Sequence, residues 1–136
     1  MEAVLASAAP VFREHGYDGA SIDLLKDATG LTAGNLNKAF KDKKGVFAAA
    51  FTYYVEDRQQ QLAERLRGSH TGRERIAETL RFYLDSASGS EGRQGCLVLA
   101  SLIEATTLDG ALHLRKCLRI GLGRGRNQPD AKPLQK

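Results

Sequence analysis

Two asparagines and a lysine lie close together in the first half of the chain, at Asn35, Asn37 and Lys38. A carboxamide presents a donor and an acceptor side by side, so each asparagine could pair with an adenine edge in the DNA major groove, a contact worth about 1–3 kcal/mol. A lysine ammonium could bind a backbone phosphate. Considered alone, such asparagines are more often solvated polar residues and such lysines a solubilising surface. Their positions in the fold must decide between the two interpretations.

Neighbouring residues could also contact a nucleic-acid backbone. Thr32 can donate its hydroxyl to a phosphate or a base, and Gly34 allows a close backbone approach. Ser21 begins a helix whose N-terminus attracts anions. Lys43 and Lys44 begin a later helix, where the helix dipole disfavours each cation by about 0.3–1 kcal/mol unless a phosphate lies there. The candidate DNA-binding residues are Ser21, Thr32, Ala33, Gly34, Asn35, Asn37, Lys38, Lys43 and Lys44.

The segment SIDLLKDATGLTAGNLNKAF predicts two short helices joined by a tight turn. Ser21 and Thr32 are natural N-caps. Gly30 can adopt the positive φ that often ends a helix. Leu36 and Phe40 lie one turn apart and predict the inner face of the second helix. This pattern is typical of a helix-turn-helix, whose second helix enters the major groove of DNA.

Two longer helices are expected on either side of this motif. One covers about residues 2–15, buries Leu5, Ala8 and either Val11 or Phe12, and ends at Gly16. Pro10 lies inside it and should kink it or cost about 3 kcal/mol. The other helix starts near residue 42 and runs for roughly 25 residues, about 40 Å, which would connect two parts of the molecule.

Helical spacing continues further along the chain. A helix from residue 71 or 72 is expected to bury Ile76, Leu80, Leu84 and either Tyr83 or Phe82, and to end at the loop SASGSEGRQG. An apolar helix over about residues 96–106 should be internal. A last helix covers about 111–120, and the polar tail after it should be disordered.

We therefore expect an all-α fold in three parts. Residues 1–41 form the helix-turn-helix head, which extends into the start of the fourth helix to about residue 51. Residues 42–122 form a helical regulatory and dimerisation domain, and residues 123–136 a disordered tail.

Composition and residue spacing exclude several classes of protein. The 136 residues carry a net charge of +4 and include no apolar run of the roughly 20 residues that span a bilayer. The N-terminus lacks the basic start of a secretory signal, so a cytoplasmic protein without membrane contact is expected. Cys96 and Cys117 form no CxxC pair, which argues against a metal site. We find no nucleophile and base at catalytic spacing and expect neither enzyme activity nor a cofactor.

The first 50 residues resemble the DNA-binding domain of the TetR/AcrR family of bacterial regulators, without a gap from Leu5 to Phe51. The residues that carry the resemblance are Phe12, Gly16, Tyr17, Ser21, Ile22, Ala28, Thr29, Gly30, Leu31, Thr32, Gly34, Leu36, Phe40 and the run from Lys43 to Phe47. The resemblance implies a repressor that binds a pseudo-palindromic operator as a homodimer and responds to a small-molecule effector.

The chain also departs from the family pattern. Ala33, Asn37 and Ala39 stand where relatives usually carry phosphate-contacting residues. The chain ends before the last two helices usual in the family, and from about Lys116 it no longer resembles it. A truncation or frameshift is our hypothesis for that end.

A pocket in the helical body is a further expectation. Phe82, Tyr83, Leu99, Ile103 and Leu112 could line a small-molecule site, because helical bundles bind ligands between helices. Core packing is the competing interpretation for each of them. The alternative for the whole protein is a degenerate or truncated helical interaction domain that folds, can dimerise and no longer reads DNA.

Overall fold

The computed structural model describes residues 1–88 and 92–104, with side chains up to residue 101. Throughout these ranges the regular structure is helical, which confirms the all-α class. The helices are α1 (Glu2–Gly19), α2 (Ile22–Thr29), α3 (Ala33–Phe40), α4 (Lys43–Leu66), α5 (Gly72–Ser86) and α7 (Leu97–Glu104).

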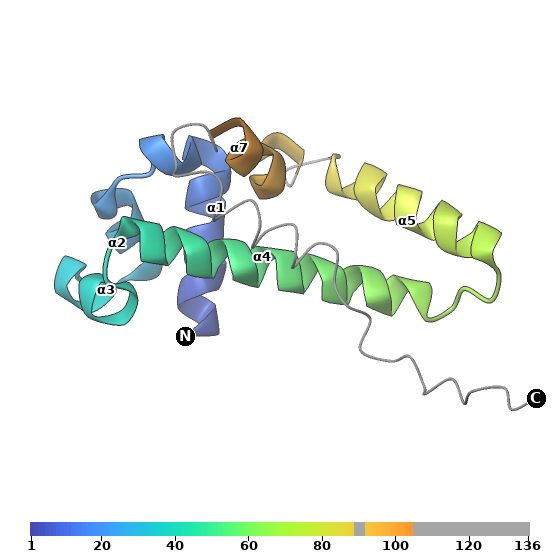
Figure 1. Ribbon diagram of the computed structural model, residues 1–136, viewed down its shortest axis with the longest axis horizontal. Coiled ribbons are helices and arrows are strands. Elements are labelled where there is room, and N and C mark those ends of the chain that lie inside the picture. The colour runs from blue at the N-terminus through green and yellow to red at the C-terminus, as the bar shows by residue number, and fades with distance from the viewer. Residues whose placement is uncertain (89–91, 105–136) are drawn as a thin grey trace, which may run out of the picture.

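The helices are arranged around the long α4 (Figure 1). Its 24 residues span about 36 Å at 1.5 Å each. The first three helices gather at its N-terminal end, with α3 at the outer edge, while α5 returns beside its C-terminal half. Helix α7 packs against α1. The predicted long connecting helix is therefore confirmed, and it begins and ends close to the expected residues.

An aromatic cluster fixes α1 on α4. The ring of Phe47 in α4 meets Phe12 edge to face, with centroids 5.0 Å apart, and meets Tyr17 in the same manner at 5.2 Å. Such pairs add about 0.5–1.5 kcal/mol each beyond their buried area. Leu25 and Leu36 are buried in the same core and anchor α2 and α3 on it. The first turns of α4 thus belong to the core that orients the helix-turn-helix.

The end of α1 differs in detail from the prediction. The helix breaks at Gly16, where φ is 69° and ψ is −179°, and continues for one more turn to Gly19. Within α1 the non-helical dihedral angles occur at Gly16, so Pro10 causes no break. Phe12 is fully buried and Val11 only half-buried, which settles the alternative that the sequence left open.

The expected burial on α5 is wrong for three leucine and isoleucine residues. Ile76, Leu80 and Leu84 are 65%, 60% and 67% exposed, whereas Phe82 is 5% exposed. The reason is tertiary, because α5 packs mainly on α4 and it is Phe82 that faces that helix. Helical spacing identifies an apolar face but cannot supply the element that covers it.

The expectation that the apolar helix near residue 100 is internal is only partly correct. Leu97 is buried in the main core, but Leu99 is 61% exposed because α7 contacts α1 and α4 on one side. The expected helix over 111–120 and the disordered tail lie outside the described residues. No helix in the described ranges is long and apolar enough to cross a bilayer.

Candidate nucleic-acid interface

Local hydrogen bonds define the turn between α2 and α3. The Ser21 hydroxyl accepts the Leu24 amide at 3.1 Å and caps α2. Gly30 has φ 70° and ψ 10° at the end of α2, and its N–H donates to the Lys26 carbonyl at 2.8 Å. The Thr32 hydroxyl then accepts the Asn35 amide at 3.2 Å and caps α3. Both predicted N-caps and the glycine that ends α2 are confirmed.

Helix α3 has one buried and one exposed face. Leu36 is 1% exposed and faces the core. Gly34, Asn35, Asn37 and Lys38 are exposed, and Ala33 is half-buried. Within the described part of the chain, neither asparagine carboxamide is used in a hydrogen bond. The donor and acceptor of each amide are therefore available to a ligand in solution.

Lysines surround the end of α3. Lys38, Lys41 and Lys44 are exposed, and Asp42 is the acidic residue among them. One carboxylate oxygen of Asp42 accepts the Gly45 amide at 2.7 Å and caps α4. A capping carboxylate at a helix N-terminus offsets the dipole that disfavours the neighbouring lysines. The segment 38–44, with four lysines against Asp42, carries net positive charge, as polyanion binding requires.

Lys43 has partners within the protein. Its ammonium donates to the Asp18 carbonyl at 3.3 Å and lies 4.7 Å from the centroid of the Tyr17 ring. Burial, followed by the charges of Asp42 and Asp18, raises the pKa of the Tyr17 phenol. Lys43 thus links the start of α4 to the last turn of α1, 25 residues earlier, a long-range contact that sequence reasoning did not anticipate.

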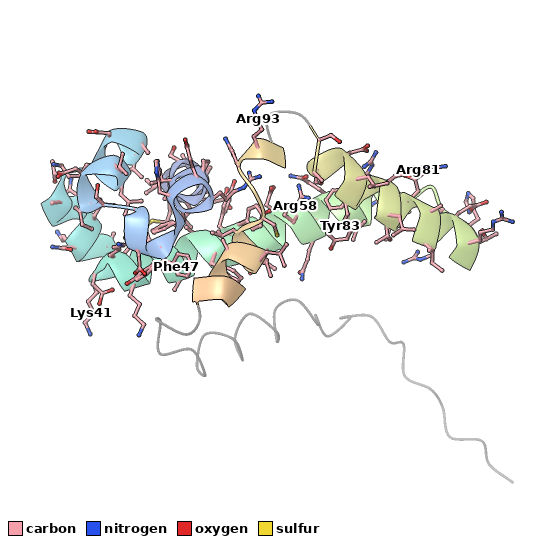
Figure 2. All side chains as sticks on the ribbon, turned by 90° about the horizontal axis from the view of Figure 1, so that it is seen from above. Lys41, Phe47, Arg58, Arg81, Tyr83 and Arg93 are labelled. Carbon is pink, nitrogen blue, oxygen red and sulfur yellow. The ribbon has the colours of Figure 1, made fainter. Side chains whose placement is uncertain are left out.

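Sequence reasoning also left Lys41 out of the candidate site. It follows α3 with φ 73° and ψ −48°, a backbone conformation that residues other than glycine rarely adopt. Its ammonium projects outward at this end of the molecule (Figure 2). The α3–α4 corner is tight, since a Cβ at Gly45 would overlap the Phe40 carbonyl. The run of lysines was visible in the sequence, whereas the strained dihedral angle was not.

The sequence matches the profile of the family described as "Bacterial regulatory proteins, tetR family" over residues 4–50. This match covers α2, α3, most of α1 and the first turns of α4. Residues 4–50 of the chain belong to the TetR family.

Curated relatives and a solved structure agree with this assignment. The chain is 28% identical over 109 residues to the "Uncharacterized HTH-type transcriptional regulator YezE" of Bacillus subtilis and 29% identical over 101 residues to the "HTH-type transcriptional repressor BdcR" of Escherichia coli. These matches cover 80% and 74% of the chain, but only 56% and 51% of the relatives. The chain also resembles the crystal structure of a TetR-family transcriptional regulator from Cytophaga hutchinsonii, with a TM-score of 0.71 and 29% sequence identity. This match covers 87% of the chain and 58% of that protein.

The predicted ligand residues are divided between two cavities. Tyr83 and Leu99 line a cavity of about 740 Å³ bounded by α1, α4, α5 and the start of α7. Phe82 lines a neighbouring cavity of about 810 Å³. The side chains of Ile103 and Leu112 lie outside the described residues. Core packing holds for the buried Phe82, whereas Tyr83 and Leu99 are 59% and 61% exposed.

Polar residues of these cavities were missed by a search for apolar side chains. Arg13, Tyr54 and Arg58 line both of them. Burial, and next the nearby Cys96 thiol, raises the pKa of the Tyr54 phenol. In the described ranges no three His, Cys, Asp or Glu side chains gather as a metal site would require.

Proposed function

We propose that this TetR-family protein is a transcriptional repressor that binds a pseudo-palindromic operator with α3 in the major groove. The observation that carries the proposal is the exposed pair of unused carboxamides on α3, one on either side of the buried Leu36. Side chains on the first two turns of a recognition helix reach base edges in this docking mode. The word "repressor" in the name of the E. coli relative supports the direction of regulation.

Each candidate residue has a proposed role. Asn35 and Asn37 pair with adenine edges, and Ala33 and Gly34 allow the backbone to approach. Thr32 binds a base or phosphate with its hydroxyl proton, because its oxygen already accepts the Asn35 amide. Phosphates are bound by the α2 N-terminus at Ser21 and by the lysines Lys38, Lys41, Lys43 and Lys44.

Lys43 has a second role in this scheme. Its ammonium carries two further hydrogens besides the one donated to Asp18, so it can bind a phosphate while holding α1 against α4. A phosphate at this position would also bind near the exposed amide end of α4.

We further propose that the protein acts in the cytoplasm as a homodimer and responds to a small-molecule effector. Two heads are needed because a single helix-turn-helix buries little surface on DNA, and dimers place their recognition helices one DNA turn apart. In this scheme, residues 1–41 form the head, residues 42–122 the regulatory and dimerisation domain, and residues 123–136 the tail. An effector favours one spacing of the heads and so changes operator affinity.

The test uses the full chain and labelled duplexes that tile the DNA upstream of its own gene. Fluorescence anisotropy at several salt concentrations should find one fragment bound at least about a thousandfold tighter than shuffled DNA. Sedimentation of the complex should give two protein chains per fragment. Equal binding to all duplexes, or no binding, would contradict the proposal and favour a helical interaction domain that does not read DNA.

A further inference from the structure

The described residues that line the cavity of about 740 Å³ carry positive charge. Two arginines line it, Arg13 from α1 and Arg58 from α4, and no aspartate or glutamate is among its described lining residues. Its volume lies within the usual range of organic ligand sites. Leu62 and Leu99 contribute to a mainly apolar wall. Such a cavity attracts a molecule that is anionic at one end and apolar elsewhere.

Arg58 is the cation with capacity for a further partner. Its guanidinium stacks 4.5 Å from the centroid of the Phe82 ring, and within the described ranges no carboxylate forms an ion pair with it. Asp85, which lines the neighbouring cavity together with Arg58 and Phe82, pairs with Arg65 at 2.8 Å. Stacking occupies a face of the guanidinium and leaves its edge, where all five N–H groups lie, open to a planar anion.

Two further groups support anion binding at the same place. Tyr54 precedes Arg58 by one turn of α4 and lines the cavity. Burial raises the pKa of its phenol, so the group keeps its proton and can donate a hydrogen bond. Arg13 adds positive charge while it donates from Nε to the Gly95 carbonyl at 3.0 Å and stacks on the Tyr54 ring at 5.4 Å. Figure 2 labels Arg58 of α4 and Tyr83 of α5, which both line this cavity.

We propose that this cavity binds an amphipathic organic carboxylate, whose carboxylate pairs with Arg58 and whose apolar body packs against Leu62, Tyr83 and Leu99. Arg13 belongs to α1, which carries the DNA-binding core, so an occupied cavity contacts the head directly. The assignment of this ligand as the effector rests on the proposed function, whereas its binding does not.

The first experiment measures binding by calorimetry on the full chain without DNA. Three probes share one aromatic body: 1-naphthylacetate, 1-naphthylacetamide and 2-(1-naphthyl)ethylammonium. We expect the carboxylate to bind about tenfold or more tightly than the neutral amide, as for hydrogen bonds to charged groups. The ammonium should bind more weakly than the amide. Equal affinity for carboxylate and amide, or no binding of the carboxylate, would overturn the proposal.

The second experiment assigns the charge preference to Arg58. Arg58→Gln should remove the preference for the carboxylate and leave the affinity for the amide unchanged. The matched control is Arg67→Gln, since Arg67 is the C-cap residue of the same helix, pairs with Glu64 and lines neither cavity. Arg58→Lys keeps the charge and should retain part of the preference, which serves as the test if the glutamine variant fails to fold. An unchanged preference in a folded Arg58→Gln protein would refute the role of Arg58.

A third measurement separates this inference from the proposed function. Operator binding is repeated with 1-naphthylacetate present. An anion that binds in the absence of any specific DNA binding would uphold the site and contradict the proposed function. Specific DNA binding by a protein that does not bind the carboxylate would support the proposed function and contradict the site. An anion that binds and leaves operator affinity unchanged would uphold the site and refute its role as effector site.

Discussion

Two glycines in the first turns of neighbouring helices allow the α3–α4 corner to be tested with a matched pair of variants. Gly45 lies in α4, and a Cβ built on it overlaps the backbone carbonyl of Phe40. Gly34 lies in α3, and a Cβ there would meet its first neighbour, the Thr32 hydroxyl oxygen, at 4.0 Å. Both substitutions to alanine improve helix propensity by up to about 1 kcal/mol. Only one of them meets a backbone atom.

The expected free energies therefore have opposite signs. Gly34→Ala should raise the free energy of unfolding by up to about 1 kcal/mol, because the added methyl group meets no atom closer than ordinary van der Waals contact. Gly45→Ala must displace the backbone, and overpacking costs about 1–3 kcal/mol, which outweighs the gain in propensity. Gly45→Ala should consequently unfold at a lower urea concentration than the wild type, by about 1–2 kcal/mol net.

The assay is urea unfolding of the full chain, followed by far-ultraviolet circular dichroism, with all three proteins measured together. If Gly45→Ala were as stabilising as Gly34→Ala, the corner between α3 and α4 would be looser than described. The orientation of α3 relative to the core would then lose its explanation. Gly34→Ala should also weaken operator binding despite its greater stability, because the added methyl group lies on the exposed face of α3.

Three further predictions concern single residues. Asn35→Ala should leave the free energy of unfolding within about 0.5 kcal/mol of the wild type, because the residue is exposed. It should also relax base preference at one operator position. A binding-site selection in which the variant keeps the wild-type preference at every position would contradict this. Lys41→Gly should relieve the strain of the positive φ and stabilise the fold by up to about 1 kcal/mol. It should also lower the salt dependence of DNA binding by the equivalent of about one phosphate contact. An unchanged salt dependence would refute that contact. The pKa of Glu74 is lowered by backbone hydrogen bonds from His70 and Thr71, so its contribution to stability should be present above the ordinary pKa of about 4.5 and be lost as the pH falls through the lowered value. Glu74→Gln should abolish that part of the acid-induced loss, and identical pH profiles of unfolding would show that the capping box contributes nothing.

The local features of the helix-turn-helix could be predicted because they depend on residues only a few positions apart. Ser21 and Thr32 each cap a helix through an amide three residues later. Gly30 ends α2 through a bond to Lys26, four residues earlier. The inward face of α3 follows from helical spacing alone. In such segments the sequence, the caps and the core all favour the same structure.

Features that depend on distant residues could not be predicted in this way. Lys43 interacts with Asp18 in the last turn of α1, and no spacing rule connects the two. The apolar face of α5 was visible, but Ile76 and Leu84 remain exposed because the described helices do not cover them. Arg13 and Arg58 line the same two cavities because α1 packs across α4. Tertiary contacts decide these outcomes.

The central claim is that the carboxamides of α3 read adenine in the major groove. Adenine presents N7 and N6 there, and 7-deazaadenine removes the N7 acceptor while Watson–Crick pairing is kept. The most direct measurement replaces each operator adenine in turn and compares the wild type with Asn35→Ala and Asn37→Ala. We predict at least one adenine per half-site at which the replacement weakens wild-type binding by about tenfold and has no effect on one of the two variants. Equal losses for all three proteins at every adenine would show that neither asparagine reads the operator.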